Sequence, residues 1–185
     1  MAPDGPAPRR AVWRPGRSPV DLFTHAGLTR EPRIILLDYQ CTLVANGDGR
    51  REWFARHGGR RPYTDWIGQE VYREWLLPLF QGRRVVLITA RDARYEVPTL
   101  ARIGEVLDWQ PDEWNFNPWG LRPDLCKRRV LEESVFARHG RPEATAYLAL
   151  ESNPTTRAMY AREGVHAVRV PEDGHWTALP QIPPG

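Results

Sequence analysis

The amino-acid sequence predicts a three-layer α/β fold, in which helices cover both faces of a parallel β-sheet. Three observations support this prediction. The length of 185 residues suits a single domain. Short apolar runs end abruptly in polar residues, as strands buried inside a sheet do. Segments with helical periodicity separate these runs, and strands that alternate with helices form parallel sheets.

Three apolar runs are the expected central strands. They cover residues 34–37, 85–88 and 146–150, and each is apolar throughout, which is typical of strands that are buried on both faces. A fourth run, 167–170, follows Gly164 and predicts a shorter strand nearer the edge of the sheet.

Helices are expected in the gaps between the strands. Thr64 can cap a helix whose apolar residues share one face. These residues are Ile67, Val71, Trp75 and Leu79. The segments 95–107 and 123–139 continue the helical periodicity, and the second of them begins with a proline. A short helix over 154–162 should end before Gly164.

The two ends of the chain differ in composition from the middle. Residues 1–30 are rich in proline and arginine and lack periodicity, so we expect a basic arm there. Residues 31–170 should form the folded domain, and 171–185 a proline-rich tail. The sequence contains no apolar run of the kind that a signal peptide or a membrane helix needs. We therefore expect a cytoplasmic protein without a membrane partner, whose oligomeric state the sequence leaves open.

The charged and sulfur-containing residues further limit the kinds of site and partner that the protein can have. Two cysteines are too few for a disulfide framework or, alone, for a structural zinc site. A net charge of +3 and a pI near 9.1 permit a polyanionic partner such as nucleic acid. Lys127 is the only lysine in the chain. It either supplies a compact charge that a planar guanidinium cannot replace, or simply lies on a solvated helix face.

Polar residues follow three of the expected strands, at the edge where parallel sheets bind ligands. Asp38 follows the first strand, Thr89 and Arg91 follow the second, and Glu151 follows the third. Lys127 lies in the helix before that third strand. Such a set suits phosphoryl transfer, in which a carboxylate attacks phosphorus while a hydroxyl, an ammonium group and Mg²⁺ hold its oxygens.

The order of these segments resembles the four motifs of the haloacid dehalogenase superfamily of phosphotransferases. IILLDYQCTL resembles the first motif, and VVLITAR resembles the second. Lys127 corresponds to the lysine of the third motif, and YLALESN resembles the fourth. The key residues are separated by 51, 38 and 24 positions. The resemblance implies a Rossmann-like fold of the haloacid dehalogenase type, without a large cap domain.

Within the superfamily, the chain most resembles the 3′-phosphatase domain of phage polynucleotide kinase-phosphatase. This similarity is carried by RPDLCKRRVLEESVFARHG, by AYLALESNPTTRAMYAREGVHAVRV and by the turn RRPYTDW. It covers roughly residues 34–170 and implies a phosphorylated substrate, with a nucleic-acid 3′-phosphate end as one candidate.

The resemblance also implies a role for each site residue. The catalytic positions are Asp38, the nucleophile that would form an aspartyl-phosphate, together with Gln40, Thr89 and Lys127. The implied substrate-binding residues are Arg61, Arg91 and Thr42. Magnesium would be held by Asp38, the backbone carbonyl of Gln40, Glu151 and Ser152.

Three positions depart from the family pattern. Gln40 stands where the phosphatases have an aspartate that protonates the leaving group, Cys41 replaces a glycine, and Ser152 replaces the second acid of the fourth motif. An amide is no proton donor of that kind, and general acid–base catalysis contributes about 10²–10⁴ in rate. We therefore consider a Mg²⁺-dependent phosphohydrolase first. The alternatives are a degenerate member that binds nucleic-acid ends or a protein, and a phosphotransferase with an acceptor other than water.

Two segments outside the motifs leave alternatives open. The aromatic segment 109–119 could stack on bases or cover the sheet edge. The arginine-rich segment 50–61 could track phosphates or form a solvated insertion.

Overall fold

The structure is a computed structural model that describes residues 31–58 and 61–170. The expected basic arm, 1–30, and the proline-rich tail, 171–185, lie outside the described residues. Within the described part of the chain, none of the helices combines the length and apolar character that crossing a bilayer demands.

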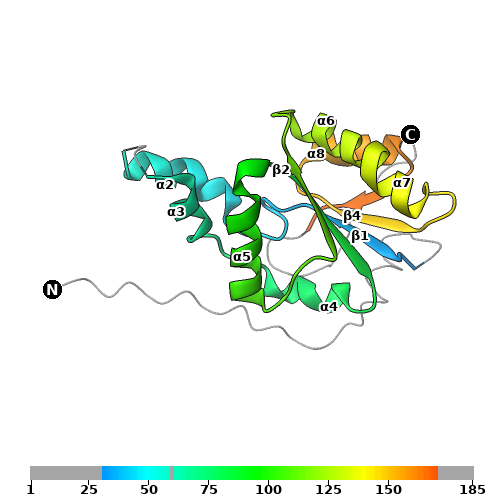
Figure 1. The fold of residues 1–185 in the computed structure, drawn as a ribbon, viewed down its shortest axis with the longest axis horizontal. Helices are drawn as coiled ribbons and strands as arrows, with labels where there is room; N and C mark the ends of the chain where they lie inside the picture. The colour runs from blue at the N-terminus through cyan, green and yellow to red at the C-terminus, as the bar shows by residue number, and fades with distance from the viewer. Residues whose placement is uncertain (1–30, 59–60, 171–185) are drawn as a thin grey trace.

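Across the described residues, five strands form one parallel sheet in the order β3-β2-β1-β4-β5 (Figure 1). The strands are β1 (Ile34–Leu37), β2 (Arg84–Asp92), β3 (Glu113–Asn117), β4 (Tyr147–Leu150) and β5 (His166–Val168). The central strand β1 pairs with β2 and β4, so that Leu37 lies beside Leu87 and Leu150. The strand order reverses direction between β1 and β4, and open α/β sheets bind ligands at such a switch point.

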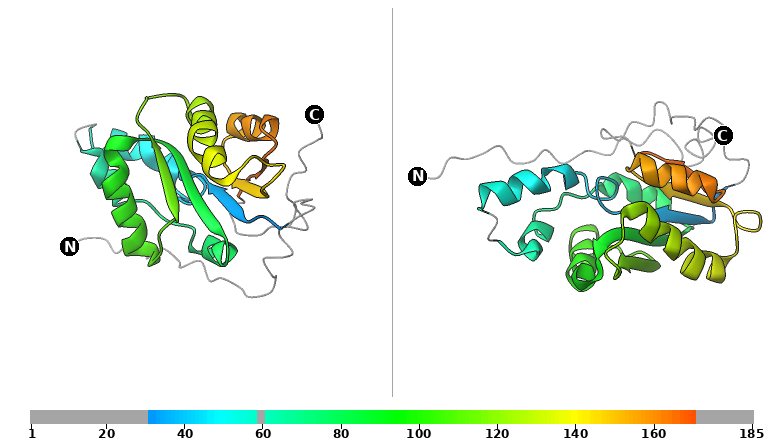
Figure 2. Two further views of the ribbon diagram at one scale, coloured as in Figure 1. Left: turned by 45° about the vertical axis from the view of Figure 1, so that its right-hand side comes forward. Right: turned by 90° about the horizontal axis from the view of Figure 1, so that it is seen from above.

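Helices cover both faces of this sheet and confirm the predicted three-layer α/β, Rossmann-like fold (Figures 1 and 2). One face packs against α4 (Leu77–Phe80) and α5 (Glu96–Leu107). The other packs against α6 (Pro123–Val130), α7 (Phe136–His139) and α8 (Pro154–Arg162). Alternate residues of β1 enter the two cores, Ile35 and Leu37 on the first face and Ile34 and Leu36 on the second. This double burial explains why the strand is apolar throughout.

A small helical insertion follows β1 in place of a large cap domain. It contains α2 (Arg50–Arg56) and α3 (Tyr63–Ile67), which extend away from the sheet at the left of Figure 1. Shorter helical turns are η1 (Gly47–Gly49), η2 (Glu74–Leu76) and η3 (Ala93–Tyr95). The segment 50–61, expected either to track phosphates or to form a solvated insertion, thus contains α2.

Three of the four expected helices are confirmed. The helix α5 matches the segment 95–107, and α8 matches 154–162. Gly164 follows α8 with a φ of 74°, in the left-handed conformation that glycine adopts at helix ends. The expected helix over 123–139 consists of α6, a π-helical turn η4 (Leu131–Val135) and α7.

The expectation of a single helix over 64–79 capped by Thr64 is wrong, because the segment is divided into separate helices. Pro62 precedes α3, which contains Thr64 and ends at Ile67, and helical structure returns only in η2 and α4. Val71, expected on the apolar face, is 53% exposed. Tyr72 instead forms an antiparallel bridge with Val44 in the loop after β1. This pairing joins distant segments of the chain, so the local periodicity of the sequence does not reveal it.

The aromatic segment 109–119, which could stack on bases or cover the sheet edge, contains the edge strand β3 itself, a strand that was not predicted from the sequence. Phe116 is buried in the core while Trp114 is 44% exposed, as alternation along an edge strand requires. The strand β2 consequently continues beyond Ile88 to Asp92, since its last residues pair with β3 after an irregularity in the register. Thr89 and Arg91 therefore lie within a strand.

Candidate active site

Lys127 joins two acidic side chains at the carboxyl edge of the sheet. Asp38 follows β1, and Glu151 follows the neighbouring strand β4. The Nζ atom of Lys127, on α6, lies 2.5 Å from Oδ1 of Asp38 and 2.5 Å from Oε2 of Glu151. Residues far apart in the sequence therefore meet at the switch point of the sheet.

The three charged groups of this cluster perturb one another. Burial by itself lowers the pKa of Lys127, but the negative charges of Asp38 and Glu151 outweigh burial and raise this pKa above its usual value. Burial raises the pKa of Glu151 to about 7, the charge of Asp38 acts in the same direction, and Lys127 opposes both. One ammonium group cannot neutralise two carboxylates, so the charge of Asp38 adds to the effect of burial, which is the main reason for the raised pKa of Glu151.

Asp38 is the more exposed acid of the cluster. It is 8% exposed, whereas Glu151 and Lys127 are each 1% exposed. The hydroxyl of Thr42 donates to Oδ2 of Asp38 at 3.0 Å and orients the carboxylate. Both oxygens of Glu151 already accept hydrogen bonds, from Lys127 and from the backbone N–H of Asn153 at 2.8 Å. This arrangement suits Asp38 as a nucleophile and Glu151 as the group that positions Lys127.

The loop that presents Asp38 is held by a buried guanidinium group. Nη1 of Arg73 donates to the carbonyl oxygens of Cys41, Thr42 and Val44 at 3.0, 2.8 and 3.2 Å. Cys41 has a φ of 59°, in the left-handed region that favours glycine. The turn thus has the shape for which the family pattern uses glycine, although a cysteine occupies it.

Three oxygen atoms converge where the resemblance implies Mg²⁺. Oγ of Ser152 lies 3.3 Å from Oδ2 of Asp38 and 3.1 Å from the carbonyl oxygen of Gln40. Adjacent ligands of an octahedral Mg²⁺, each at about 2.1 Å, lie about 3 Å apart, so the donor set fits this ion. Glu151, the fourth expected ligand, binds Lys127 instead. Among the described residues, no group of three or more His, Cys, Asp or Glu side chains could hold a metal.

Thr89 lies on β2, two positions beyond Leu87, which pairs with the last residue of β1. It is 1% exposed, and its Oγ1 accepts a hydrogen bond from the backbone N–H of Arg91 at 3.1 Å. Because the hydroxyl is the acceptor in this bond, its own hydrogen is available for donation. The expected contact of Thr89 with a phosphoryl oxygen stays a prediction.

The substrate-binding role expected of Arg91 does not fit its position. Its guanidinium group is buried, forms an ion pair with Glu70 and donates to Oγ1 of Thr99 at 2.8 Å. The hydroxyl of Tyr39 donates to the same carboxylate at 2.7 Å and lies 2.6 Å from that of Tyr72. Arg91, on β2, thus connects α5 through Thr99 with the segment after the insertion through Glu70. The sequence gives no signal for this network, because its members lie in four separate segments.

Arg61, also expected to bind substrate, lies on the exposed surface of the insertion. Its guanidinium group pairs with Asp65 at 3.4 Å, and its side chain is 60% exposed. The structure does not bring Arg61 together with Asp38 and Lys127 in the way that the resemblance implies.

Gln40 is turned toward the helical insertion. Its Nε2 donates to the hydroxyl oxygen of Tyr63 at 3.3 Å, and Nη1 of Arg50 donates to the same oxygen at 3.4 Å. Tyr63 is the first residue of α3 and Arg50 the first of α2. Arg50 belongs to the arginine-rich segment that could track phosphates, and Tyr63 belongs to the turn RRPYTDW that carries part of the resemblance, but neither residue was expected to contact Gln40.

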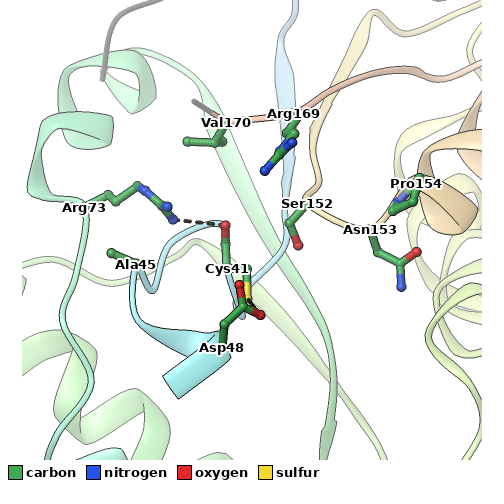
Figure 3. Close-up of a pocket in the computed structure, with 9 residues that line it drawn as sticks. All are labelled: Cys41, Ala45, Asp48, Arg73, Ser152, Asn153, Pro154, Arg169 and Val170. Atoms are coloured by element: carbon green, nitrogen blue, oxygen red, sulfur yellow. Dashed lines mark hydrogen bonds between the residues drawn. The ribbon is translucent and has the colours of Figure 1, made fainter. Parts of the chain in front are cut away.

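A cavity of about 520 Å³ adjoins the cluster. Figure 3 shows Cys41 and Arg73 on one side of it, and Ser152 and Asn153 at the start of α8 on the other. Ser152 also contacts Asp38, and Cys41 lines the cavity, so the cavity adjoins the loop after Asp38. A volume of this size is typical of small-molecule sites.

Comparison with solved structures finds chains of similar fold, among them one in a structure described as the Pnkp1/Rnl/Hen1 RNA repair complex and one in a structure described as the Pnkp1/Rnl/Hen1 complex. Each shares 18% sequence identity with this chain and covers 77% of it, with TM-scores of 0.55 and 0.54. This chain spans less than half of their lengths, 43% and 47%. No protein-family model matches the sequence, and no curated protein matches it significantly. At this level of identity, the chain shares a fold with these components of an RNA repair complex.

Proposed function

We propose that this protein is a Mg²⁺-dependent phosphohydrolase that acts through an aspartyl-phosphate on Asp38. The observation that carries the proposal is the position of Lys127, whose Nζ lies 2.5 Å from each of two acids at the switch point. A buried ammonium group beside a reachable carboxylate favours the approach of a phosphate dianion to that carboxylate. The burial of Glu151 and Lys127 leaves Asp38 as the attacking group.

Each residue of the cluster has a part in the reaction. The carboxylate of Asp38 attacks phosphorus, and the bond from phosphorus to the leaving oxygen breaks. Lys127 uses two of its three N–H donors for Asp38 and Glu151, which leaves one for a phosphoryl oxygen. The hydroxyl of Thr89 donates to a second phosphoryl oxygen. Water then attacks the aspartyl-phosphate and releases inorganic phosphate.

Asp38, the carbonyl group of Gln40 and Ser152 would hold Mg²⁺ at their converging oxygens. When bound, the ion supplies charge neutralisation and polarises the phosphoryl group. With a single carboxylate among these three donors, affinity for Mg²⁺ depends strongly on the oxygens of the substrate phosphate itself.

A nucleic-acid 3′-phosphate end is the substrate that we propose. Two observations support it: the insertion leaves the site without a large cap, and the fold neighbours belong to an RNA repair complex. The net charge of +3 is compatible with a polyanion.

The test incubates the purified protein and Mg²⁺ with p-nitrophenyl phosphate or with a 3′-phosphorylated oligonucleotide. We expect release of phosphate by the wild type, and its loss in Asp38→Asn and in EDTA. The variant Asp65→Asn is the matched control, because this acid lies on the insertion and pairs with an exposed arginine. Equal rates for the wild type and Asp38→Asn would refute the nucleophile assignment.

A second candidate function is a binding module for nucleic-acid ends or a protein partner. It is favoured by Gln40, since an amide cannot protonate a leaving group. The variant Gln40→Asp separates the two functions. If the wild type releases phosphate at a measurable rate and Gln40→Asp releases it much faster, the enzymatic function is supported. Binding of a 3′-phosphorylated oligonucleotide without turnover by either form would support the module.

A further inference from the structure

We propose that Tyr63 is a further catalytic residue, which donates the proton that the leaving alkoxide needs. This inference rests on the proposed phosphohydrolase function. An alkoxide is a poor leaving group unless it is protonated as the bond to phosphorus breaks, and Gln40 has no acidic proton to give. Tyr63 is the proton donor that contacts Gln40 directly.

The hydrogen bonds around Tyr63 leave its proton available. Its phenol oxygen accepts hydrogen bonds from Nε2 of Gln40 at 3.3 Å and from Nη1 of Arg50 at 3.4 Å. Both neighbours are donors that cannot accept in return at those atoms, so the phenol hydrogen must point elsewhere. A substrate oxygen that enters beside Gln40 can receive it.

Gln40 connects Tyr63 to the loop after Asp38, because its side chain contacts Tyr63 and its backbone faces Ser152. Oγ of Ser152 lies 3.1 Å from the backbone carbonyl oxygen of Gln40 and 3.3 Å from Oδ2 of Asp38, so the backbone of Gln40 and the carboxylate of Asp38 border one site. Gln40 and Tyr63 are both only partly buried, and a substrate can reach them. The proposal therefore places the leaving group of a phosphate attacked by Asp38 beside Gln40 and Tyr63.

The ring of Tyr63 is held in place on two sides. The ring of Tyr95 packs against it with a centroid distance of 4.4 Å, and the guanidinium group of Arg91 lies 5.2 Å from its centroid. Arg91 is itself fixed by the ion pair with Glu70. A donor held in this way keeps the geometry that proton transfer requires. The two arginines near Tyr63, Arg50 and Arg91, also stabilise the negative charge left after the transfer.

Other proton-bearing groups near the loop are less suited to this role. Tyr39 is fully buried and donates to Glu70. The Sγ atom of Cys41 donates to Asp48 at 3.3 Å, and burial raises the pKa of this thiol to about 11. Neither group has a free path to a leaving oxygen next to Gln40.

The proposed cycle conserves protons. As Asp38 bonds to phosphorus, the bond from phosphorus to the leaving oxygen breaks, and the proton of Tyr63 passes to that oxygen to give an alcohol and a phenolate. Water then attacks the aspartyl-phosphate, the bond from Asp38 to phosphorus breaks, and the phenolate takes a proton from the water. Tyr63 and Asp38 are restored, and the net reaction is hydrolysis of the phosphomonoester.

The test compares Tyr63→Phe with the wild type on two substrates with Mg²⁺, p-nitrophenyl phosphate and an alkyl phosphate. Nitrophenolate leaves without a proton, whereas an alkoxide does not. We expect kcat on the alkyl phosphate to fall by about 10²–10⁴ and kcat on the aryl phosphate to fall less than about tenfold. The control is Tyr95→Phe, which removes a hydroxyl from the ring packed on Tyr63 and should leave the ratio of the two rates unchanged.

A second variant keeps the test independent of folding. In the double variant Tyr63→Phe with Gln40→Asp, the new carboxyl group should restore turnover of the alkyl phosphate. An equal loss on both substrates, or no loss on the alkyl phosphate, would overturn the role of Tyr63 while Asp38-dependent turnover of the aryl phosphate upholds the proposed function. Absence of any Asp38-dependent turnover in the wild type would overturn both.

Discussion

Replacing Lys127 by methionine should destabilise the fold far more than replacing its exposed neighbour. Lys127 is 1% exposed, and its ammonium group is 2.5 Å from both Asp38 and Glu151. Methionine has a similar length and fills the space, but it leaves two buried carboxylates facing each other. Removal of one partner from a buried ion pair costs about 3–5 kcal/mol. For a chain of this size, such a loss lowers Tm by roughly 6–20 °C.

Arg128→Met is the matched control, because Arg128 is the next residue of α6. It pairs with Glu163 at 2.9 Å, but its side chain is 61% exposed. Exposed pairs contribute about 0–1 kcal/mol. Unfolding of both variants can be followed by the fluorescence of the eight tryptophans, in urea and on heating, without divalent metal. If the free energy of unfolding falls no more in Lys127→Met than in Arg128→Met, the buried triad of charges is refuted.

Two further predictions concern the same buried charges. Because burial raises the pKa of Glu151 from 4.5 to about 7, the stability that its proton contributes is complete below about pH 4.5 and is lost as the pH rises through 7. In metal-free buffer, Glu151→Gln should flatten the pH dependence of the free energy of unfolding across this window; an unchanged slope would contradict the shift. Glu70→Gln leaves the guanidinium group of Arg91 buried without its counter-ion, so we expect a loss of about 3–5 kcal/mol in urea unfolding. Glu52→Gln removes an exposed pair and should cost less than about 1 kcal/mol, and equal losses in these two variants would count against the network around Arg91.

The strands that the sequence predicts are those whose burial makes them apolar on both faces. The residues of β1 and β4 enter both cores, and each run ends at a polar residue. The edge strand β3 escapes prediction because half of it faces solvent and three of its five residues are Glu or Asn. The alternation of Trp114 and Phe116 with polar residues was the available signal. Local patterns thus reveal the centre of this sheet better than its edge.

The candidate site likewise contains residues whose proximity the sequence predicts and residues whose contacts it does not predict. Asp38, Lys127 and Glu151 lie at strand ends or on a helix that the sequence predicts, so their approach follows from the topology of a parallel sheet. Arg91 follows a strand too, but its partner Glu70 lies in a segment with no regular structure to predict. The contact between Gln40 and Tyr63 depends on how the insertion folds back on the loop after β1. Long-range contacts of irregular segments leave no periodic trace in the sequence.

The single lysine of the chain occupies a position where arginine would be a poor substitute. Its ammonium group serves two carboxylates at 2.5 Å and keeps a third donor, all from one compact atom. A guanidinium group spreads five donors over a plane and needs more partners when it is buried, as the surroundings of Arg91 illustrate. That side chain requires a carboxylate, a hydroxyl and the face of an aromatic ring 4.3 Å away. In a chain where arginine otherwise replaces lysine throughout, the geometry at Asp38 and Glu151 is a sufficient physical reason for Lys127 to remain a lysine.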